Sequence, residues 1–199
     1  MTRTHHRQQW RKITLACATA VLAVGCTGNQ PASPKPPPTT PAATSTTAPE
    51  PTKTEVPVDP VEAAKKEAIA TYLSHWKEVQ KRYGDKTNKA GDLEKYAASA
   101  ALSQVKYDTG NMRKRNTVAL GTVTVGNPTA TSADIDRKIP NVIISSCLDI
   151  SQWQVVNADT KKPVSLPKER LLRYVMKATV EKWPEGWRVI RDEPQGKKC

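Results

Sequence analysis

The ten residues TVALGTVTVG, numbered 117–126, are where the sequence changes from a helical period to a period of two. Apolar and small polar side chains alternate here, and side chains two positions apart lie on the same face of a β-strand. Further strands are predicted at 141–150, 153–156, 171–183 and 187–191, with a tight turn at 184–186 between the last two. Because two helical segments precede these strands, the sequence predicts an α+β domain with helices packed on one face of an antiparallel sheet.

The first helix is predicted to begin at Asp59. Asp59 suits the N-cap, Pro60 suits the first turn, and Glu62 has the spacing of a capping box. An apolar stripe with three- and four-residue steps follows, formed by Val61, Ala64, Ala68, Tyr72, His75, Trp76, Val79 and Tyr83. A second helical region is predicted as a short piece at 93–97 and a longer piece that is capped by Ser99.

The first 25 residues have the layout of a secretory signal. A basic stretch without acids precedes an apolar run, which is shorter than the roughly 20 residues of a membrane-spanning helix. The run ends in Leu22-Ala23-Val24-Gly25-Cys26, which resembles the bacterial lipobox. We therefore predict that residues 1–25 are removed and that a lipid on Cys26 anchors the chain at the outer face of the bacterial cytoplasmic membrane. Ordinary secretion is the alternative, because Ala23 stands where the motif usually has leucine.

Residues 26–57 are predicted to form a disordered tether behind the lipidated cysteine. They consist mainly of Pro, Thr, Ala and Ser. Such a composition buries too little apolar surface to offset the entropy that is lost on ordering. Residues 58–199 remain, and their number is typical of a single domain.

The chain is basic, with a formal charge of +12, and loss of the first 25 residues leaves about +8. Outside a bacterial membrane such a charge favours anionic lipid head groups or anionic cell-wall polymers as partners. An envelope protein is a further expected partner, and nucleic acid is not expected there. The candidate polymer-binding patch is the cluster Arg113, Lys114 and Arg115. Its other interpretation is a solvated helix end, where cations complement the helix dipole.

Two cysteines remain in the predicted mature domain, because Cys17 leaves with the signal and Cys26 takes the lipid. Cys147 and Cys199 are therefore expected to form one disulfide in an oxidising compartment. This bond would fix the last residue of the chain to a strand in the middle of the domain. Two cysteines and one mature histidine, His75, do not make a recognisable metal site, and no cofactor is expected.

Three short motifs stand out in the domain: CLDIS at 147–151 followed by WQVV at 153–156, Trp183 and Trp187 around a tight turn, and the terminal cysteine. With these motifs, residues 60–199 resemble a group of secreted actinobacterial lipoproteins that looks like the nuclear-transport-factor-2-like superfamily. The resemblance implies helices followed by a strongly curved antiparallel sheet that folds into a cone. That superfamily contains enzymes as well as non-catalytic modules, so the fold does not decide the activity.

Isomerases and cyclases of that superfamily use a carboxylate base in the pocket, often with a tyrosine or a second acid. The candidate pocket residues here are His75, Asp149 and Tyr174, and none lies in a motif that maps onto a catalytic position. His75 is otherwise a packed residue of the helical stripe, and Asp149 is otherwise the acceptor of a hydrogen bond in a turn. The tryptophans are expected to fill the core. Serine-hydrolase and zinc-protease signatures are absent from the sequence.

The sequence favours a lipid-anchored, non-catalytic binding or accessory module on the extracytoplasmic side of the membrane. Its ligand is expected to be a partner protein, a wall polymer or a small apolar molecule. The long tether and the missing catalytic signatures support this expectation. The two alternatives are a small pocket enzyme of the isomerase or cyclase type and an electrostatic binder of anionic cell-wall polymer.

Overall fold

The computed structural model describes residues 59–199, so the predicted signal, Cys26 and the tether lie outside the described range. Within it, helices come first: α1 (Pro60–Gly84), α2 (Leu93–Tyr96) and α3 (Ser99–Lys114). The strands follow: β1 (Thr117–Gly121), β2 (Thr124–Asp134), β3 (Asn141–Asp149), β4 (Trp153–Asn157), β5 (Arg173–Trp183) and β6 (Gly186–Pro194). This order confirms the predicted α+β class. Of the helices in this part of the chain, none is long and apolar enough to cross a membrane.

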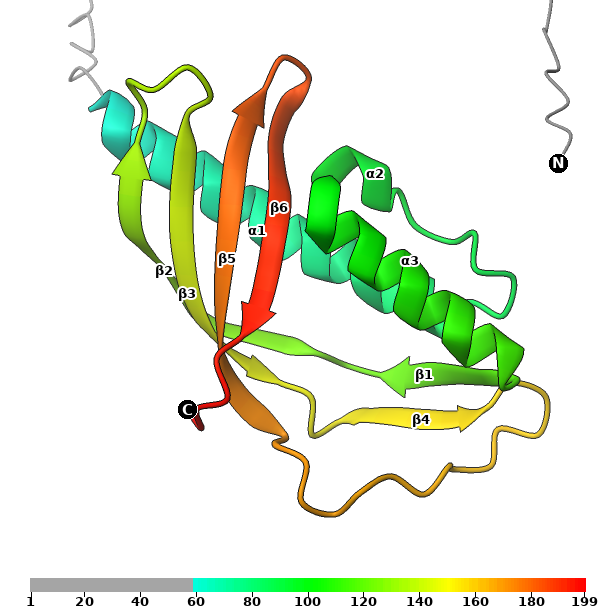
Figure 1. Ribbon diagram of the computed structural model, residues 1–199. Helices are drawn as coiled ribbons and strands as arrows, with labels where there is room; N and C mark the ends of the chain where they lie inside the picture. Colours follow the sequence, from blue (N-terminus) through cyan, green and yellow to red (C-terminus); the bar gives the residue numbers. More distant parts are fainter. Residues whose placement is uncertain (1–58) are drawn as a thin grey trace, which may run out of the picture. The chain divides into compact units, whose positions relative to one another are not determined.

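The strands form two antiparallel sheets, a small one of β1 and β4 and a larger one in the order β2-β3-β5-β6. The larger sheet is open, because β2 and β6 are its outer strands and do not pair with each other. Figure 1 shows α1 crossing one face of this sheet and continuing past β6, behind α3. The start of α3 is tied to the outer edge of β6, where the amide of Ala98 donates to the carbonyl of Val189 at 2.9 Å.

The two predicted helix caps have different outcomes. Asp59 caps α1 as predicted, since its side chain accepts a hydrogen bond from the Val61 amide at 2.9 Å. Ser99 does not cap α3, so that prediction was wrong. Ala98 occupies the cap position without a side-chain hydrogen bond, and Ser99 opens the helix with a φ of +50°. The backbone of Ala98 is already bonded to β6, and this tertiary contact sets where α3 begins.

The stretch 117–126 is two strands rather than the one that the sequence predicted, because the chain bends after Gly121. Gly121 has a φ of +100°, and a Cβ atom there would lie 1.9 Å from the carbonyl oxygen of Gln152. Only glycine fits this conformation and this close approach. The opposite strand bends at the same level, since Gly121 pairs with Trp153 and Thr124 pairs with Asp149. The segments β1–β2 and β3–β4 therefore form one long, bent hairpin, whose β2–β3 half belongs to the larger sheet and whose β1–β4 half forms the small sheet.

The hydrophobic core lies between α1 and the larger sheet. Successive side chains of β3 alternate between its two faces, and Val142, Ile144 and Leu148 point into the core with no exposed surface. Cys147 directly precedes Leu148, so its side chain lies on the other face of β3, where it forms the predicted disulfide with Cys199. The last residues of the chain are therefore held against the sheet beyond the end of β6.

The outer strand β2 is irregular. Its pairing with β3 shifts register twice, between Gly126 and Thr129 and again between Ala130 and Ser132. Pro128 lies within the first shift and has no amide hydrogen to donate. Such bulges bend a strand and are common at sheet edges.

Candidate functional site

A pocket of about 520 Å³ lies between α1, α3 and the adjoining parts of β5 and β6. Aromatic side chains form much of its wall, namely Trp76, Tyr83, Trp153 and Tyr174. Polar and charged side chains also line it, namely His75, Gln104, Asp108, Arg191, Asp192 and Glu193. Small-molecule sites in proteins are commonly of this size, with apolar walls and a few polar groups.

The second half of α1 supplies the inner wall of the pocket. His75, Trp76, Val79 and Tyr83 belong to the apolar stripe that the sequence places on one face of this helix. The same stripe packs on the sheet in the first half of α1, where Ala68 and Tyr72 are fully buried. Beyond β6 the helix has left the larger sheet and runs behind α3, as Figure 1 shows, and there the Tyr83 hydroxyl donates to Asp108 of α3. The pocket therefore arises where a continuous apolar stripe runs past the edge of its sheet.

A buried pair of titratable side chains forms the floor of the pocket. The Nε2 atom of His75 lies 3.5 Å from the Oδ2 atom of Asp192, and the two side chains are 1% and 7% exposed. Burial raises the pKa of the Asp192 carboxyl above its ordinary value, while the neighbouring His75 ring acts in the opposite direction. Within 59–199, His75 Nδ1, Asp192 Oδ1 and Trp76 Nε1 are buried and lack a hydrogen-bond partner. Buried polar atoms are normally bonded, so these atoms have bonding capacity that the described chain leaves unused, although the Trp76 indole and the His75 ring lie close enough to Asp192 to lower its pKa against the effect of burial.

The aromatic wall is held in place by its own contacts. The rings of Tyr83 and Trp153 are 4.9 Å apart at an angle of 53°. The Tyr83 hydroxyl donates to Asp108 Oδ2 at 3.1 Å, and Gln104 Nε2 donates to the other oxygen of that carboxylate at 2.9 Å. Burial, aided by the nearby carboxylates, raises the pKa values of Tyr83 and Tyr174, so both phenols stay protonated at neutral pH.

The structure separates the three predicted pocket residues. His75 and Tyr174 line this pocket, and Asp149 does not. Asp149 lies at the end of β3, where it accepts a hydrogen bond from the Ser151 amide at 2.9 Å and lies 3.5 Å from Arg173 Nε. These contacts match its interpretation as a hydrogen-bond acceptor in a turn.

The carboxylate that sequence reasoning missed is Asp192. In a regular strand the alternation that buries Trp187 and Val189 would bury Arg191 next. The pairing of β6 with β5 instead shifts register, because Val189 faces Val180 whereas Arg191 faces Thr179. The extra residue turns the side chain of Asp192 inward. No local signal in the sequence marks this bulge.

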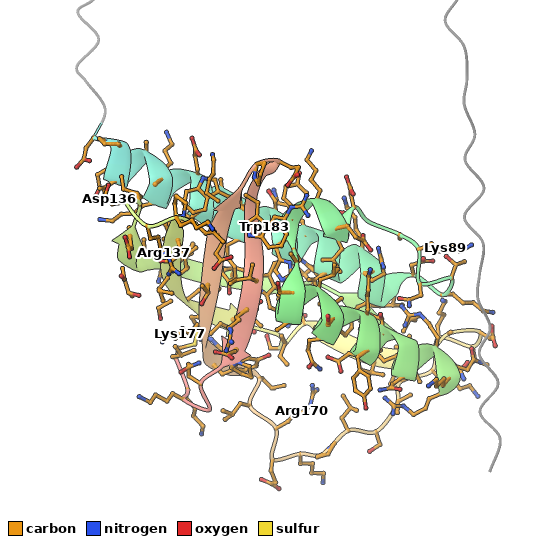
Figure 2. All side chains as sticks on the ribbon, turned by 45° about the horizontal axis from the view of Figure 1, so that its top comes forward. Lys89, Asp136, Arg137, Arg170, Lys177 and Trp183 are labelled. Carbon is orange, nitrogen blue, oxygen red and sulfur yellow. A yellow bond between two sulfur atoms is a disulfide. The ribbon has the colours of Figure 1, made fainter. Side chains whose placement is uncertain are left out.

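The predicted basic patch is also divided. Arg113 donates hydrogen bonds to three backbone carbonyls, those of Arg82, Tyr83 and Thr117, at 2.6, 3.1 and 2.9 Å. Its guanidinium thus joins the end of α1 to the start of β1, while Lys114 and Arg115 are exposed. Figure 2 shows that other basic side chains, such as those of Lys89, Arg137 and Lys177, point outward from well-separated parts of the domain. Among residues 59–199, no group of three or more His, Cys, Asp or Glu side chains is placed to hold a metal ion.

Comparison with known proteins does not assign the pocket. No family model matches the chain, and no curated protein matches it. One similar solved structure is the crystal structure of the intermembrane space region of the chloroplast protein ARC6. Its TM-score is 0.41 and its sequence identity 10%, and the match covers 69% of this chain and 98% of that chain. A similarity at this level carries no argument about ligand or activity, so function has to be inferred from the site itself.

Proposed function

We propose that this chain is a lipid-anchored module of the bacterial envelope whose domain binds a small, largely apolar ligand in the pocket between α1, α3 and β6. The observation that carries the proposal is an aromatic pocket whose floor holds buried polar atoms with free bonding capacity. Apolar walls supply affinity in such sites, and a few polar groups set the orientation of the ligand. The pocket is a property of the described domain and does not depend on the anchor.

The anchoring part of the proposal rests on the lipobox-like stretch that ends in Cys26 and on the tether that follows it. Cys26→Ala should move the chain from the membrane fraction to the soluble fraction and abolish incorporation of a labelled fatty acid. Cys17→Ala is the matched control, because it removes a cysteine of the predicted signal without touching the lipidation site. Unchanged membrane association of Cys26→Ala would show that the anchor is not this cysteine.

The pocket part is tested with the neutral apolar dye N-phenylnaphthylamine, whose fluorescence rises in an apolar environment. The dye is titrated into the full-length chain in an uncharged detergent. Dye that enters the micelles gives the same signal with every variant at the same detergent concentration, so differences between variants report binding to the protein. Ala100→Trp should block binding, because Ala100 is an exposed residue of α3 that lines the pocket. Ser103→Trp, also exposed on α3 but outside the pocket lining, is the matched control. Equal dye binding by both variants would refute the pocket as the site.

A second candidate is a small pocket enzyme, and the His75–Asp192 pair is the observation that favours it. Burial raises the pKa of this carboxyl, which makes it a stronger base than an ordinary aspartate. In that case Asp192, rather than Asp149, is the base. Turnover of a bound compound that Asp192→Asn abolishes, with binding retained, would favour the enzyme. Binding without turnover favours the module.

A further inference from the structure

The charge of the pocket is opposite to that of the chain. The chain has a formal charge of +12, whereas the pocket is lined by the carboxylates of Asp108, Asp192 and Glu193 and by one guanidinium, that of Arg191. Arg191 Nη1 lies 3.7 Å from Glu193 Oε1, so this cation already has an acid beside it. A cleft lined by one sign of charge concentrates ligands of the opposite sign. The carboxylates that remain thus favour a cationic ligand.

The floor of the pocket adds a specific acceptor. Asp192 Oδ1 is buried and accepts no hydrogen bond of ordinary geometry within the described part of the chain, although the Trp76 indole lies close enough to lower the pKa of the carboxyl against the effect of burial. A cation beside a buried carboxyl favours its ionised form. In that form the carboxylate only accepts hydrogen bonds, so the group that satisfies this oxygen has to be a donor. A ligand that brings an N–H and a positive charge would meet both needs of the buried carboxylate at once. An anionic ligand would instead be repelled by it.

The walls suit the same class of ligand. Trp76, Tyr83, Trp153 and Tyr174 line the same pocket as Asp192 and give it aromatic surface. The faces of such rings attract cations within about 6 Å of the ring centre, and tryptophan does so most strongly. The rings also bury the hydrocarbon part of a ligand. An aromatic-lined pocket that contains a carboxylate therefore matches an amine that is attached to an apolar body.

From the acidic lining, the unpartnered Asp192 oxygen and the aromatic walls together, we infer that the pocket binds a protonated organic amine. Its N–H group donates to Asp192, and its hydrocarbon part packs against the rings. This inference rests on the proposed function, because it names the class of ligand for the same pocket. It identifies the ligand by charge and hydrogen-bonding pattern.

The test compares three compounds of similar size that differ in charge: phenethylamine, phenethyl alcohol and hydrocinnamate. Each displaces the neutral dye from the full-length chain, and the displacement gives its affinity. The amine should bind at least about tenfold more tightly than the alcohol, as expected for a charge-assisted hydrogen bond, and the carboxylate should bind most weakly. Asp192→Asn should bring the affinities of amine and alcohol close together. Asp149→Asn, an aspartate at the end of a strand outside the pocket, should leave the preference intact.

A second variant keeps the test decisive if Asp192→Asn fails to fold. Tyr174→Leu retains the carboxylate and removes one ring, so the preference for the amine should fall by about threefold while the alcohol still binds. If the unmodified chain binds the alcohol or the carboxylate as tightly as the amine, the cation inference is wrong, and the pocket proposal is unaffected. Failure of the neutral dye itself to bind would overturn the pocket proposal, and the cation inference with it.

Discussion

Helix α1 places two buried polar side chains against the sheet, one turn apart, and their surroundings differ. The hydroxyl oxygens of Tyr72 and Ser146 are 2.9 Å apart in a hydrogen bond, and neither side chain has an unpartnered buried atom in the described domain. His75 and Asp192 face each other at 3.5 Å, and each keeps a buried atom without a partner. The first pair meets the requirements of a stable core. Burial is therefore common to both pairs, and unmet bonding capacity distinguishes the one that suits a ligand.

Removal of the disulfide should have the largest effect and should separate the two pairs. In the chain-entropy model, the double variant Cys147→Ser, Cys199→Ser loses about 4 kcal/mol of the free energy of unfolding, because the bond joins residues 52 positions apart. The segment after β6 then loses its covalent attachment, so amide hydrogen exchange should rise near Asp192 before it rises at Ser146 in the central strand β3. Urea unfolding and hydrogen exchange measure the two effects. Earlier loss of protection at Ser146 would contradict the prediction.

Loss of the Tyr72 hydroxyl should affect stability and not binding. Tyr72→Phe leaves the buried hydroxyl of Ser146 without its partner, which should lower the free energy of unfolding by about 1–2 kcal/mol. The pocket should bind its ligand as before, because Tyr72 does not line it. Urea unfolding and dye titration report the two properties. Adding Ser146→Ala is the control, since it removes the unsatisfied hydroxyl and should recover part of the loss.

Asp192→Asn should show the reverse behaviour. The free energy of unfolding at neutral pH should stay within about 1 kcal/mol of that of the unmodified chain, because the change removes the need to bury a charge. The preference for amine ligands should disappear. A loss of stability larger than that caused by Tyr72→Phe would mean that the His75–Asp192 pair is structural, and the contrast between the two pairs would fail.

The smallest expected effect is a pH dependence. The folded-state pKa of Asp192 is raised, so between its ordinary value near 4 and the raised value the folded chain binds more protons than the unfolded chain. The contribution of this carboxyl to stability therefore falls as the pH rises through that window. Tyr72 and His75 from α1, Tyr174 from β5 and Glu193 beside it in β6 surround the group and modulate the size of the effect.

This pH dependence is measured as a difference between the unmodified chain and Asp192→Asn in urea unfolding at several pH values. The free energy of unfolding of the unmodified chain minus that of the variant should decline with rising pH. Hydrogen bonds from Thr87 and from backbone amides lower the pKa of Asp85, which gives the opposite slope. That slope is present in both proteins and cancels in the difference. A flat difference would show that Asp192 does not titrate in this window.

Local signals in the sequence predicted most of the elements. The cap at Asp59 and the apolar stripe behind it placed α1, and the change of period at 117–126 placed the start of the sheets. Cys147 and Cys199 were paired by elimination, since the other cysteines fall in the predicted signal and its cleavage site. These predictions need only neighbours along the chain or a count of residues.

The features that escaped prediction depend on contacts between distant segments. The bend after Gly121 is set by the carbonyl of Gln152, about thirty residues away in the sequence. The inward position of Asp192 is set by the bulge in β6, where the pairing with β5 shifts register. His75 and Tyr174 were chosen from the sequence and line the pocket, but the carboxylate between them was hidden by a change of register. A bulge adds one residue to a strand, so beyond it the alternation of the sequence no longer tells which side chains face inward.

The irregular edge of β2 matters most for a protein that is crowded on a surface. Copies anchored in one leaflet, as we propose, would diffuse in two dimensions and collide often. A long regular outer strand would offer each neighbour a row of backbone donors and acceptors on which to add its own sheet. Pro128 and the two register shifts interrupt that row in β2, and Ala98 occupies part of the edge of β6 at the other side. If the chain is anchored as proposed, these interrupted edges would let neighbouring copies collide without pairing through their sheets.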